Sequence, residues 1–191
     1  MKNEIEKYFY NEIETIKALN ISNIEKVIEI LDDALKNNKK IYIFGNGGSG
    51  STASHFVCDF NKAIFKNIDK KFDFQCLNDN MAIVSAISND IDYSEIFKYQ
   101  LKNKLKKEDI VIALSGSGNS KNIIKACEYA KEIGAKIIGF TGYNGGILKQ
   151  ISDVSIDTNI NDMQITEDIH LMIEHLIIRT FYNMYGEGKY E

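Results

Sequence analysis

The chain has 191 residues, of which 44% are hydrophobic and 26% charged, and its formal net charge is -4. This length and composition suit one domain with a substantial hydrophobic core. The acidic balance argues against general nucleic-acid binding, because no basic excess is available to neutralise a phosphate backbone. The N-terminus is charged and no run of about 18 apolar residues occurs, so we expect no signal peptide, no membrane span and a cytoplasmic protein.

The first 38 residues predict a pair of helices. Apolar residues recur at spacings of three and four, first at Ile5, Phe9 and Ile13 and again from Ile24 onward. Ser22, with Glu25 three positions later, is typical of an N-cap and its capping box. We expect this pair to pack against the rest of the domain or against another subunit.

From residue 40 onward, apolar runs alternate with helical patterns. Strands that are apolar throughout and separated by helices indicate a parallel sheet covered on both faces. The predicted fold is therefore a three-layer α/β/α sandwich in a single domain spanning residues 1–191. The predicted strands are Lys40–Phe44, Phe72–Leu77, Ile110–Leu114, Lys136–Phe140 and Val154–Ile156, and the longer predicted helices are Asn119–Ile133 and Asp162–Tyr185.

Two of these strands run into loops rich in glycine and serine that then open a helix. They are Gly45–Thr52 and Ser115–Ser120. Such a loop directs backbone N–H groups and the positive end of the helix dipole at one spot, and the serine hydroxyls add donors. Both loops fall at strand carboxyl ends, where open α/β sheets bind ligands. The pattern predicts a site for an anion, most simply a phosphate.

The first loop does not indicate a nucleotide. Gly45, Gly47 and Gly50 match the dinucleotide pattern G-x-G-x-x-G, but the acidic residue expected about 20 positions later, at the end of a second strand, is missing. Ser51 stands where a P-loop needs its lysine. The three cysteines, Cys58, Cys76 and Cys127, form no C-x-x-C pair and are expected to be small core residues.

The chain resembles the sugar isomerase (SIS) domain family, and within it the phosphoheptose isomerases. The resemblance covers nearly the whole chain and depends on the order and spacing of several short motifs. These motifs are Gly45–Ser49 with His55-Phe56, Asn89-Asp90, Ser115–Ser120, Thr141-Gly142 with Gly145-Gly146, and Glu167–His170 with His175.

The resemblance implies a flavodoxin-like fold of about five parallel strands with two leading helices, assembled as a homotetramer. It implies an aldose–ketose isomerase that converts sedoheptulose 7-phosphate to D-glycero-D-manno-heptose 7-phosphate for the heptose units of surface polysaccharide. It implies a phosphorylated sugar as substrate and, as in some members of the family, zinc as metal. With the composition and the loop pattern above, we expect no nucleotide cofactor and no nucleic-acid or membrane partner.

Carried over by position, the resemblance assigns the site residues. The phosphate would be held by Ser115, Gly116, Ser117, Gly118 and Ser120. The sugar would contact Asn46, Gly47, Gly48, Ser49, Asn89 and Asp90. The family's metal positions fall on His55, Asp59, Glu167 and His175, and the catalytic residues would be Asp59, Glu167 and His175.

Two of these positions depart from the family pattern. Asp59 replaces a usual glutamate and Glu167 a usual glutamine, and the arginine often found just before position 167 is missing. Two histidines and two carboxylates suit tetrahedral zinc. Without metal, Glu167 or Asp59 would be the base and His175 the acid.

Helical geometry supports part of this assignment. His55 and Asp59 are four residues apart and share a helix face. Glu167 and His175 differ by roughly 80° around their helix, whereas Asp168 and His175 differ by only about 20°. Periodicity thus favours Asp168 and the resemblance favours Glu167, which we follow. His170 is expected to be an interior residue.

Two other functions stay open. One is a non-catalytic SIS tetramer that binds a partner protein. The other is an isomerase of a different ketose phosphate, which the departures at Asp59 and Glu167 keep in view. The convergent acid and imidazole groups argue against a purely structural protein.

Overall fold

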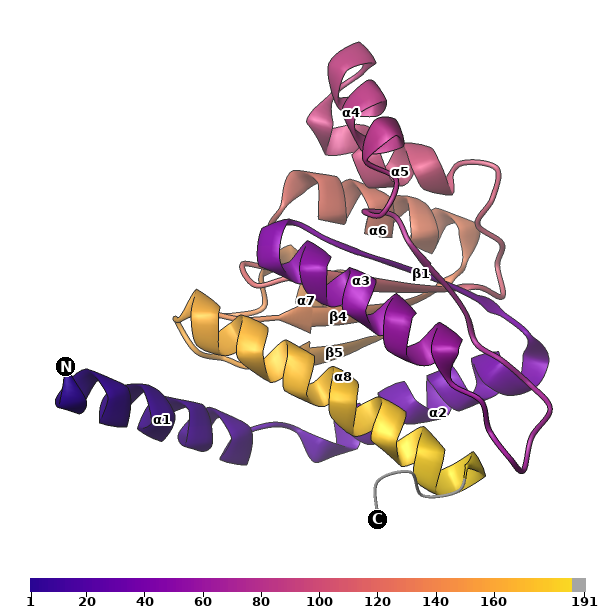
Figure 1. Ribbon diagram of the computed structural model, residues 1–191. Helices are drawn as coiled ribbons and strands as arrows, with labels where there is room; N and C mark the ends of the chain where they lie inside the picture. The colour runs from indigo at the N-terminus through magenta and orange to yellow at the C-terminus, as the bar shows by residue number, and fades with distance from the viewer. Residues whose placement is uncertain (187–191) are drawn as a thin grey trace.

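A five-stranded parallel sheet lies at the centre of the computed structural model, which describes residues 1–186 (Figure 1). All five predicted strands are present, with ends shifted by at most one residue. The strands are β1 (Lys40–Gly45), β2 (Asp73–Cys76), β3 (Ile110–Ser115), β4 (Lys136–Thr141) and β5 (Val154–Asp157). Their order in space is β2-β1-β3-β4-β5, which is the flavodoxin-like arrangement.

The sheet is buried on both faces because its strands are apolar throughout. All six residues of β3 are buried. Along β1, Ile41 and Ile43 face one hydrophobic core, while Tyr42 and Phe44 face the other. Alternate residues of a strand point to opposite sides of the sheet, so an unbroken apolar run supplies two cores at once.

Helices cover each face of the sheet and complete the predicted three-layer sandwich (Figure 1). One face is covered by α2 (Ile21–Asn37), α3 (Gly47–Lys62) and α8 (Met163–Tyr185). The other is covered by α4 (Met81–Asp90), α5 (Ile96–Leu101), α6 (Lys121–Ile133) and α7 (Gly146–Ile151). None of the helices between residues 1 and 186 combines the length and apolar character that a membrane span needs.

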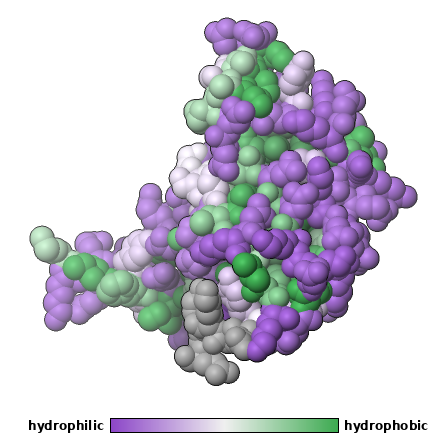
Figure 2. Space-filling view, turned by 45° about the vertical axis from the view of Figure 1, so that its right-hand side comes forward, coloured by the Kyte–Doolittle hydropathy of each residue, from purple (hydrophilic) through white to green (hydrophobic). Residues whose placement is uncertain are grey.

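Helix α1 (Lys2–Lys17) extends away from the sandwich and packs against α8 (Figure 1). Its side chains Ile5, Phe9, Ile13 and Ile16 are 38% to 58% exposed. They recur at i, i+4, i+8 and i+11, so they form one apolar stripe along the helix. Figure 2 shows hydrophobic residues along this projecting arm.

Two local predictions are wrong. The N-cap of α2 is Asn20, whose side chain accepts from the Asn23 N–H, whereas Ser22 lies in the first turn and donates to Asn20 at 2.8 Å. Of the cysteines, all unpaired, Cys127 is a buried core residue as expected, but Cys58 is exposed. Asparagine caps a helix as well as serine does, so the start of α2 could not be chosen from residue type alone.

The two glycine- and serine-rich loops meet because β1 and β3 are neighbours in the sheet. The chain leaves β1 toward β2 on one side and returns through β3 on the other, which makes this pair the topological switch point. The loop after β1 opens α3 and the loop after β3 opens α6. Both helix N-termini therefore lie at the edge where α/β sheets bind ligands.

Candidate functional site

A cavity of about 250 Å³ lies where the two loops meet, and the first turns of α8 complete it. We call it the switch-point cavity. Its lining residues are Asn46, Gly47, Gly48, Ser49, Leu114, Ser115, Gly116, Ser117, Ser120, Met163 and Glu167. Glu167 is the single titratable side chain among them, and most other lining groups are backbone or neutral polar groups.

The loop after β3 presents hydroxyls around the N-terminus of α6. The hydroxyls of Ser115 and Ser120 lie 3.3 Å apart. Ser120 is the N-cap of α6 but makes no side-chain capping bond. Gly118 has φ +66°, and a β-carbon there would lie 2.0 Å from the Gly145 carbonyl oxygen, so only glycine fits. The loop is held tightly and can direct its donors at an anion.

Asn46, in the loop after β1, is held by amides that sequence reasoning did not identify. Its side chain donates to Asn122 at 2.9 Å and accepts from the Asn122 amide at 2.8 Å. The Tyr93 hydroxyl donates to the same Asn46 oxygen at 3.0 Å. Nothing in the local sequence of Asn122 or Tyr93 signals these contacts, because they are made across long separations along the chain.

Glu167 lies directly over Gly48. A β-carbon built on Gly48 would be 2.2 Å from Glu167 Oε2, so the missing side chain of the glycine makes room for the carboxylate. The two residues come from the first turns of α3 and α8. The structure thus brings Glu167 into the cavity beside the glycine-rich loop.

A cluster of four metal-ligating side chains lies farther along the same two helices. His55 and Asp59 come from α3, and Glu174 and His175 come from α8; we call these four the α3–α8 cluster. Their ligand atoms all lie within 4.8 Å of one another. The two histidine Nε2 atoms are 3.0 Å apart, and His175 Nε2 is 3.3 Å from Glu174 Oε2. No sequence-based assignment included Glu174.

Glu174 is the most unusual member of the cluster. Its side chain has no solvent exposure, and neither carboxylate oxygen has a hydrogen-bond partner among the described residues. Burial, with a further contribution from the negative charge of Asp59, raises the pKa of Glu174 to about 8. A buried carboxylate of this kind is costly unless a cation or donor satisfies it.

Asp59 is oriented by a lysine. Its Oδ1 lies 2.5 Å from Lys62 Nζ, while its Oδ2 lies 3.5 Å from His55 Nε2 and 4.0 Å from His175 Nε2. One oxygen is therefore engaged on the outside of α3 and the other faces the histidines. The predicted members His55, Asp59 and His175 are brought together, and Glu167 is not among the residues that converge with them.

The spacing along the two helices explains this separation. Seven residues separate Gly48 from His55 on α3, and seven separate Glu167 from Glu174 on α8. Seven residues correspond to about 10 Å of helix and return to nearly the same face. Since both helices start at the same edge of the parallel sheet, Glu167 faces Gly48 in the cavity, and Glu174 faces His55 two turns later.

Three other predicted or considered residues lie elsewhere. Asn89 and Asp90 are exposed at the end of α4, where the Asn89 amide donates to Asp90 at 2.8 Å, and neither lines the switch-point cavity. Asp168 accepts from the Tyr8 hydroxyl of α1 and is turned away from α3. The sugar contacts predicted for Asn89 and Asp90 therefore remain a prediction, since neither residue lines the switch-point cavity.

His170 is an interior residue, as expected. It is 1% exposed and its Nε2 lies 3.2 Å from the Thr141 carbonyl oxygen, which makes Nε2 the protonated nitrogen. The ring packs edge-on against Phe140. Burial lowers the pKa of His170 to about 4. The residue is therefore neutral and belongs to the core.

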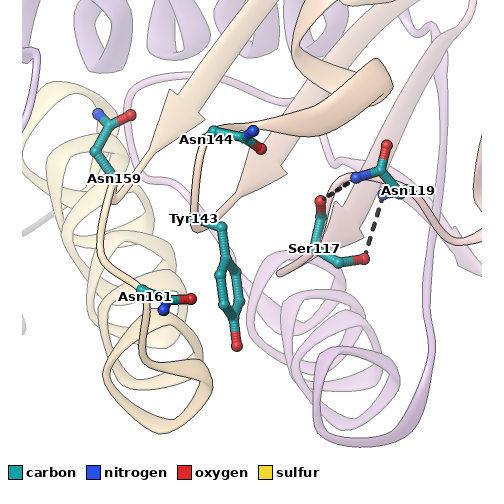
Figure 3. Close-up of a pocket in the computed structure, with 6 residues that line it drawn as sticks. All are labelled: Ser117, Asn119, Tyr143, Asn144, Asn159 and Asn161. Atoms are coloured by element: carbon teal, nitrogen blue, oxygen red, sulfur yellow. Dashed lines mark hydrogen bonds between the residues drawn. The ribbon is translucent and has the colours of Figure 1, made fainter.

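A second cavity, of about 490 Å³, shares Ser117 with the first (Figure 3). Its lining residues are Ser117, Asn119, Tyr143, Asn144, Asn159 and Asn161. The Asn119 amide donates to the Ser117 carbonyl at 2.9 Å, and the Tyr143 ring lies between Asn161 and Ser117 in this view. This lining contains no carboxylate or imidazole, whereas Glu167 lines the switch-point cavity.

The α3–α8 cluster has the composition and the spacing of a metal site. Two imidazoles and two carboxylates are a tetrahedral nitrogen and oxygen donor set. The five separations between the four ligand atoms that involve a histidine run from 3.0 to 4.0 Å. Tetrahedral zinc with bonds of about 2.05 Å places its ligand atoms about 3.3 Å apart. The residues present therefore fit such an ion.

Comparison with known proteins identifies the family. Residues 6–142 match the SIS domain. A phosphoheptose isomerase of Thermodesulfovibrio yellowstonii is 41% identical over 158 residues, covering 83% of this chain and 78% of its own length. One from Aliarcobacter butzleri is 33% identical over 186 residues, covering 96% of this chain and 98% of its own.

Solved structures agree with this match. A phosphoheptose isomerase from Francisella tularensis superimposes with a TM-score of 0.83 at 27% identity, covering 92% of this chain and 95% of that one. One from Neisseria gonorrhoeae has the same fold, with a TM-score of 0.86 at 23% identity over 95% and 98% of the two chains. The chain therefore belongs to the SIS domain family and, within it, to the phosphoheptose isomerases.

Proposed function

We propose that this protein is an isomerase that converts sedoheptulose 7-phosphate to D-glycero-D-manno-heptose 7-phosphate, a precursor of heptose units in surface polysaccharide. Its relatives at 33% and 41% identity bear the name phosphoheptose isomerase. One observation carries the proposal. The serine-rich loop after β3 and Glu167 line one cavity, and the α3–α8 cluster lies farther along the two helices that border it.

The phosphate end of the substrate binds at the loop after β3. Ser115, Ser117 and Ser120 supply hydroxyl donors, and the amides of Gly116 and Gly118 supply N–H groups at the start of α6. The sugar then extends past the first loop, where Asn46 and Ser49 offer polar contacts. Its reacting end points along α3 and α8 toward the α3–α8 cluster.

Aldose–ketose interconversion moves a proton between neighbouring carbons and another between their oxygens. Glu167 carries the proton between the carbons, because it is the carboxylate in the cavity lining and lies directly over Gly48. When bound, a divalent cation, with zinc preferred for this donor set, stabilises the negative charge that develops on the substrate oxygens. His55, Asp59 and His175 belong to the set that holds it.

A second mechanism needs no metal. In that case His175, which is 52% exposed at the rim of the cluster, passes the proton between the substrate oxygens as the acid. Asp59 would share the role of base with Glu167. Both versions place acid–base groups on the same two helices, so they differ in the need for an ion and agree on the reaction.

We also propose that the chain assembles as a homotetramer from a single SIS domain, with residues 1–38 as packing elements. The support is the apolar stripe of α1, formed by Ile5, Phe9, Ile13 and Ile16. A stripe of exposed large apolar side chains on a projecting helix is typical of a surface that another subunit covers.

The test is turnover of a defined substrate. Purified protein is incubated with sedoheptulose 7-phosphate, and in parallel with pentulose and hexulose phosphates, and isomerisation is followed by NMR. We expect the heptulose phosphate to be converted fastest. Conversion of another ketose phosphate alone would contradict the proposed substrate, and no conversion of any would favour a non-catalytic, partner-binding protein. Metal analysis and activity after chelation distinguish the two mechanisms, since full activity in metal-free protein would exclude the ion.

A further inference from the structure

We propose that Glu174 is a direct ligand of the metal, completing with His55, Asp59 and His175 a four-residue site in which Glu167 takes no part. This inference rests on the proposed metal-dependent isomerase and concerns which of the two glutamates of α8 holds the ion. It separates two tasks that family position alone would give to Glu167, namely binding the metal and moving the substrate proton.

The first argument is the state of the Glu174 side chain. It has no solvent exposure, yet both carboxylate oxygens lack a hydrogen-bond partner among residues 1–186. Buried carboxylates are normally satisfied by donors or by coordination to a cation. The groups within reach of Glu174 Oε2 are His55 Nε2 at 3.7 Å and His175 Nε2 at 3.3 Å. Both are themselves metal-ligating atoms, so a shared cation satisfies all three groups together.

The second argument is the geometry of the four ligand atoms. Glu174 Oε2 lies 3.3 Å from His175 Nε2 and 3.7 Å from His55 Nε2, so the first separation equals the edge of about 3.3 Å expected for tetrahedral zinc and the second is slightly longer. Asp59 Oδ2 completes the set from the opposite helix, at 3.5 Å from His55 Nε2. Each helix therefore contributes one imidazole and one carboxylate, and the four atoms surround a common point within 4.8 Å of one another.

The third argument is the position of Glu167. Its carboxylate lies over Gly48, one heptad before Glu174 on α8, which is about 10 Å of helix. The cluster of converging ligands found in the described part of the chain contains Glu174 and lacks Glu167. Glu167 is thus free of the ion and remains available to the substrate in the switch-point cavity.

The experiment compares Glu174→Leu with Glu167→Ala in the full-length protein. Leucine is close in size to glutamate and removes the ligand atoms without leaving a large cavity, whereas glutamine could still coordinate through its carbonyl oxygen. Glu167→Ala removes the other glutamate of the same helix. Zn²⁺ affinity is measured by competition with a chromophoric chelator, and the bound zinc is counted by elemental analysis.

We expect Glu174→Leu to weaken Zn²⁺ binding by at least about 100-fold, beyond the 10- to 100-fold range of outer-shell changes. Glu167→Ala should change the affinity by less than about threefold, because Glu167 lies about 10 Å of helix before Glu174 and belongs neither to the ligands nor to the shell of groups around them. The absorption spectrum of the Co²⁺-substituted protein gives a second readout. The intensity and position of its d–d bands should change in Glu174→Leu and stay the same in Glu167→Ala.

Thermal unfolding distinguishes a ligand from a residue needed for folding. In the presence of EDTA, Glu174→Leu should unfold at the same temperature as the parent protein or a higher one, because an unsatisfied buried carboxylate has been replaced by an apolar group. With saturating Zn²⁺ the parent protein should gain stability and Glu174→Leu should gain less at equal free zinc. A variant that is destabilised without metal as well would point to a structural role.

The failure of this inference can be told from the failure of the proposed function. If the parent protein binds zinc and isomerises sedoheptulose 7-phosphate, but Glu174→Leu retains the parent affinity or Glu167→Ala loses it, the ligand assignment is overturned and the isomerase stands. If the parent protein isomerises the substrate with no metal bound and none needed, the ligand assignment is also overturned. If it binds zinc with the expected variant pattern but turns over no sugar phosphate, the proposed function fails and the ligand assignment stands.

Discussion

Gly48 and Glu167 face each other at the start of two helices, and the carboxylate occupies the space that any side chain at position 48 would need. A β-carbon on Gly48 would lie between 2.2 and 2.7 Å from the three carboxyl atoms of Glu167. The glycine therefore sets the position of the proposed base and adds no contact of its own. Its role can be tested separately from folding.

Gly48→Ala should lower kcat by about 10-fold or more while leaving stability unchanged or slightly higher. Alanine favours the helix by about 0.5–1 kcal/mol over glycine. The group it displaces is the end of the flexible Glu167 side chain. Steady-state kinetics and urea unfolding check the two effects. Ser51→Ala, an exposed change on the same helix, is the control and should alter neither. Normal kcat in Gly48→Ala would show that the position of Glu167 is not critical.

Ser117→Ala or Ser120→Ala should mainly raise KM for the sugar phosphate, while His175→Ala should mainly lower kcat. Hydrogen bonds to a charged group contribute about 1.5–3 kcal/mol, so each serine change should raise KM by about 10- to 100-fold. His175 belongs to the α3–α8 cluster, which faces the reacting end of the substrate, so its loss should lower kcat. Initial-rate measurements over a range of substrate concentrations decide the matter, and the reverse pattern would mean that the two ends of the substrate have been exchanged.

His170 should make the protein less stable in mild acid. Its pKa is about 4 in the folded protein, against an ordinary value of 6.5, because burial disfavours the charged ring. At His170 the unfolded chain binds more protons between these values, so the stability contribution of this residue is full above pH 6.5 and is lost as the pH drops toward 4. The full effect is about 3 kcal/mol. Urea unfolding from pH 7 to 4.5 tests this.

The matched variant for this measurement is His170→Gln, whose amide can still donate to the Thr141 carbonyl. It should show a shallower loss of stability between pH 6.5 and 4.5 than the parent protein. Two other groups affect the pH dependence of both proteins. The pKa of Glu174 is raised to about 8, so its contribution to stability grows as the pH falls. Burial raises the pKa of Asp157, but hydrogen bonds from Ser155, Thr141 and Lys149 outweigh it and lower that pKa overall. Equal slopes in the two proteins would show that His170 does not titrate in this range.

Replacing Phe9 and Ile13 with lysine should disrupt the proposed tetramer. These side chains are 58% and 50% exposed on α1 and belong to its apolar stripe. Two charges on a surface buried between subunits would be left without partners, which is strongly unfavourable. Light scattering coupled to size-exclusion chromatography measures the mass. Glu14→Lys, on another face of α1, should leave it unchanged, and a tetramer that persists in the double variant would place the interface elsewhere.

The fold was predictable because the apolar runs that form the strands and the glycine- and serine-rich loops that follow two of them are both local features of the sequence. Each of the five strands is a short apolar run, and each is observed within one residue of its predicted ends. The glycine- and serine-rich loops follow β1 and β3 directly, so a parallel sheet brings them to one edge. The start of α2 was placed at Ser22 instead of Asn20 because two capping residues compete within three positions.

The sequence predicted the site residues in the two loops, but only some of those on α8. Helical periodicity predicted that Asp168 and His175 share a face of α8. In the structure Asp168 accepts a hydrogen bond from Tyr8, because α1 packs on that side of α8. Glu174 was missed although it carried a signal, because it occupies a position that the buried stripe of Ile173, Ile177 and Phe181 would reserve for an apolar side chain. Its significance emerges only when α3 is placed beside α8.

Helices α3 and α8 start at the same edge of the sheet and run in the same direction, so residues along both helices lie at set distances from that edge. Gly48 and Glu167 line the switch-point cavity near that start, and the α3–α8 cluster lies about 10 Å farther along the two helices, a distance set by seven residues of each helix. A sugar phosphate whose phosphate is bound by the loop after β3 must be long enough for its carbonyl end to lie between Glu167 and the α3–α8 cluster. The fold can therefore select a substrate by the length of its carbon chain, favouring a seven-carbon sugar over shorter ones that carry the same phosphate.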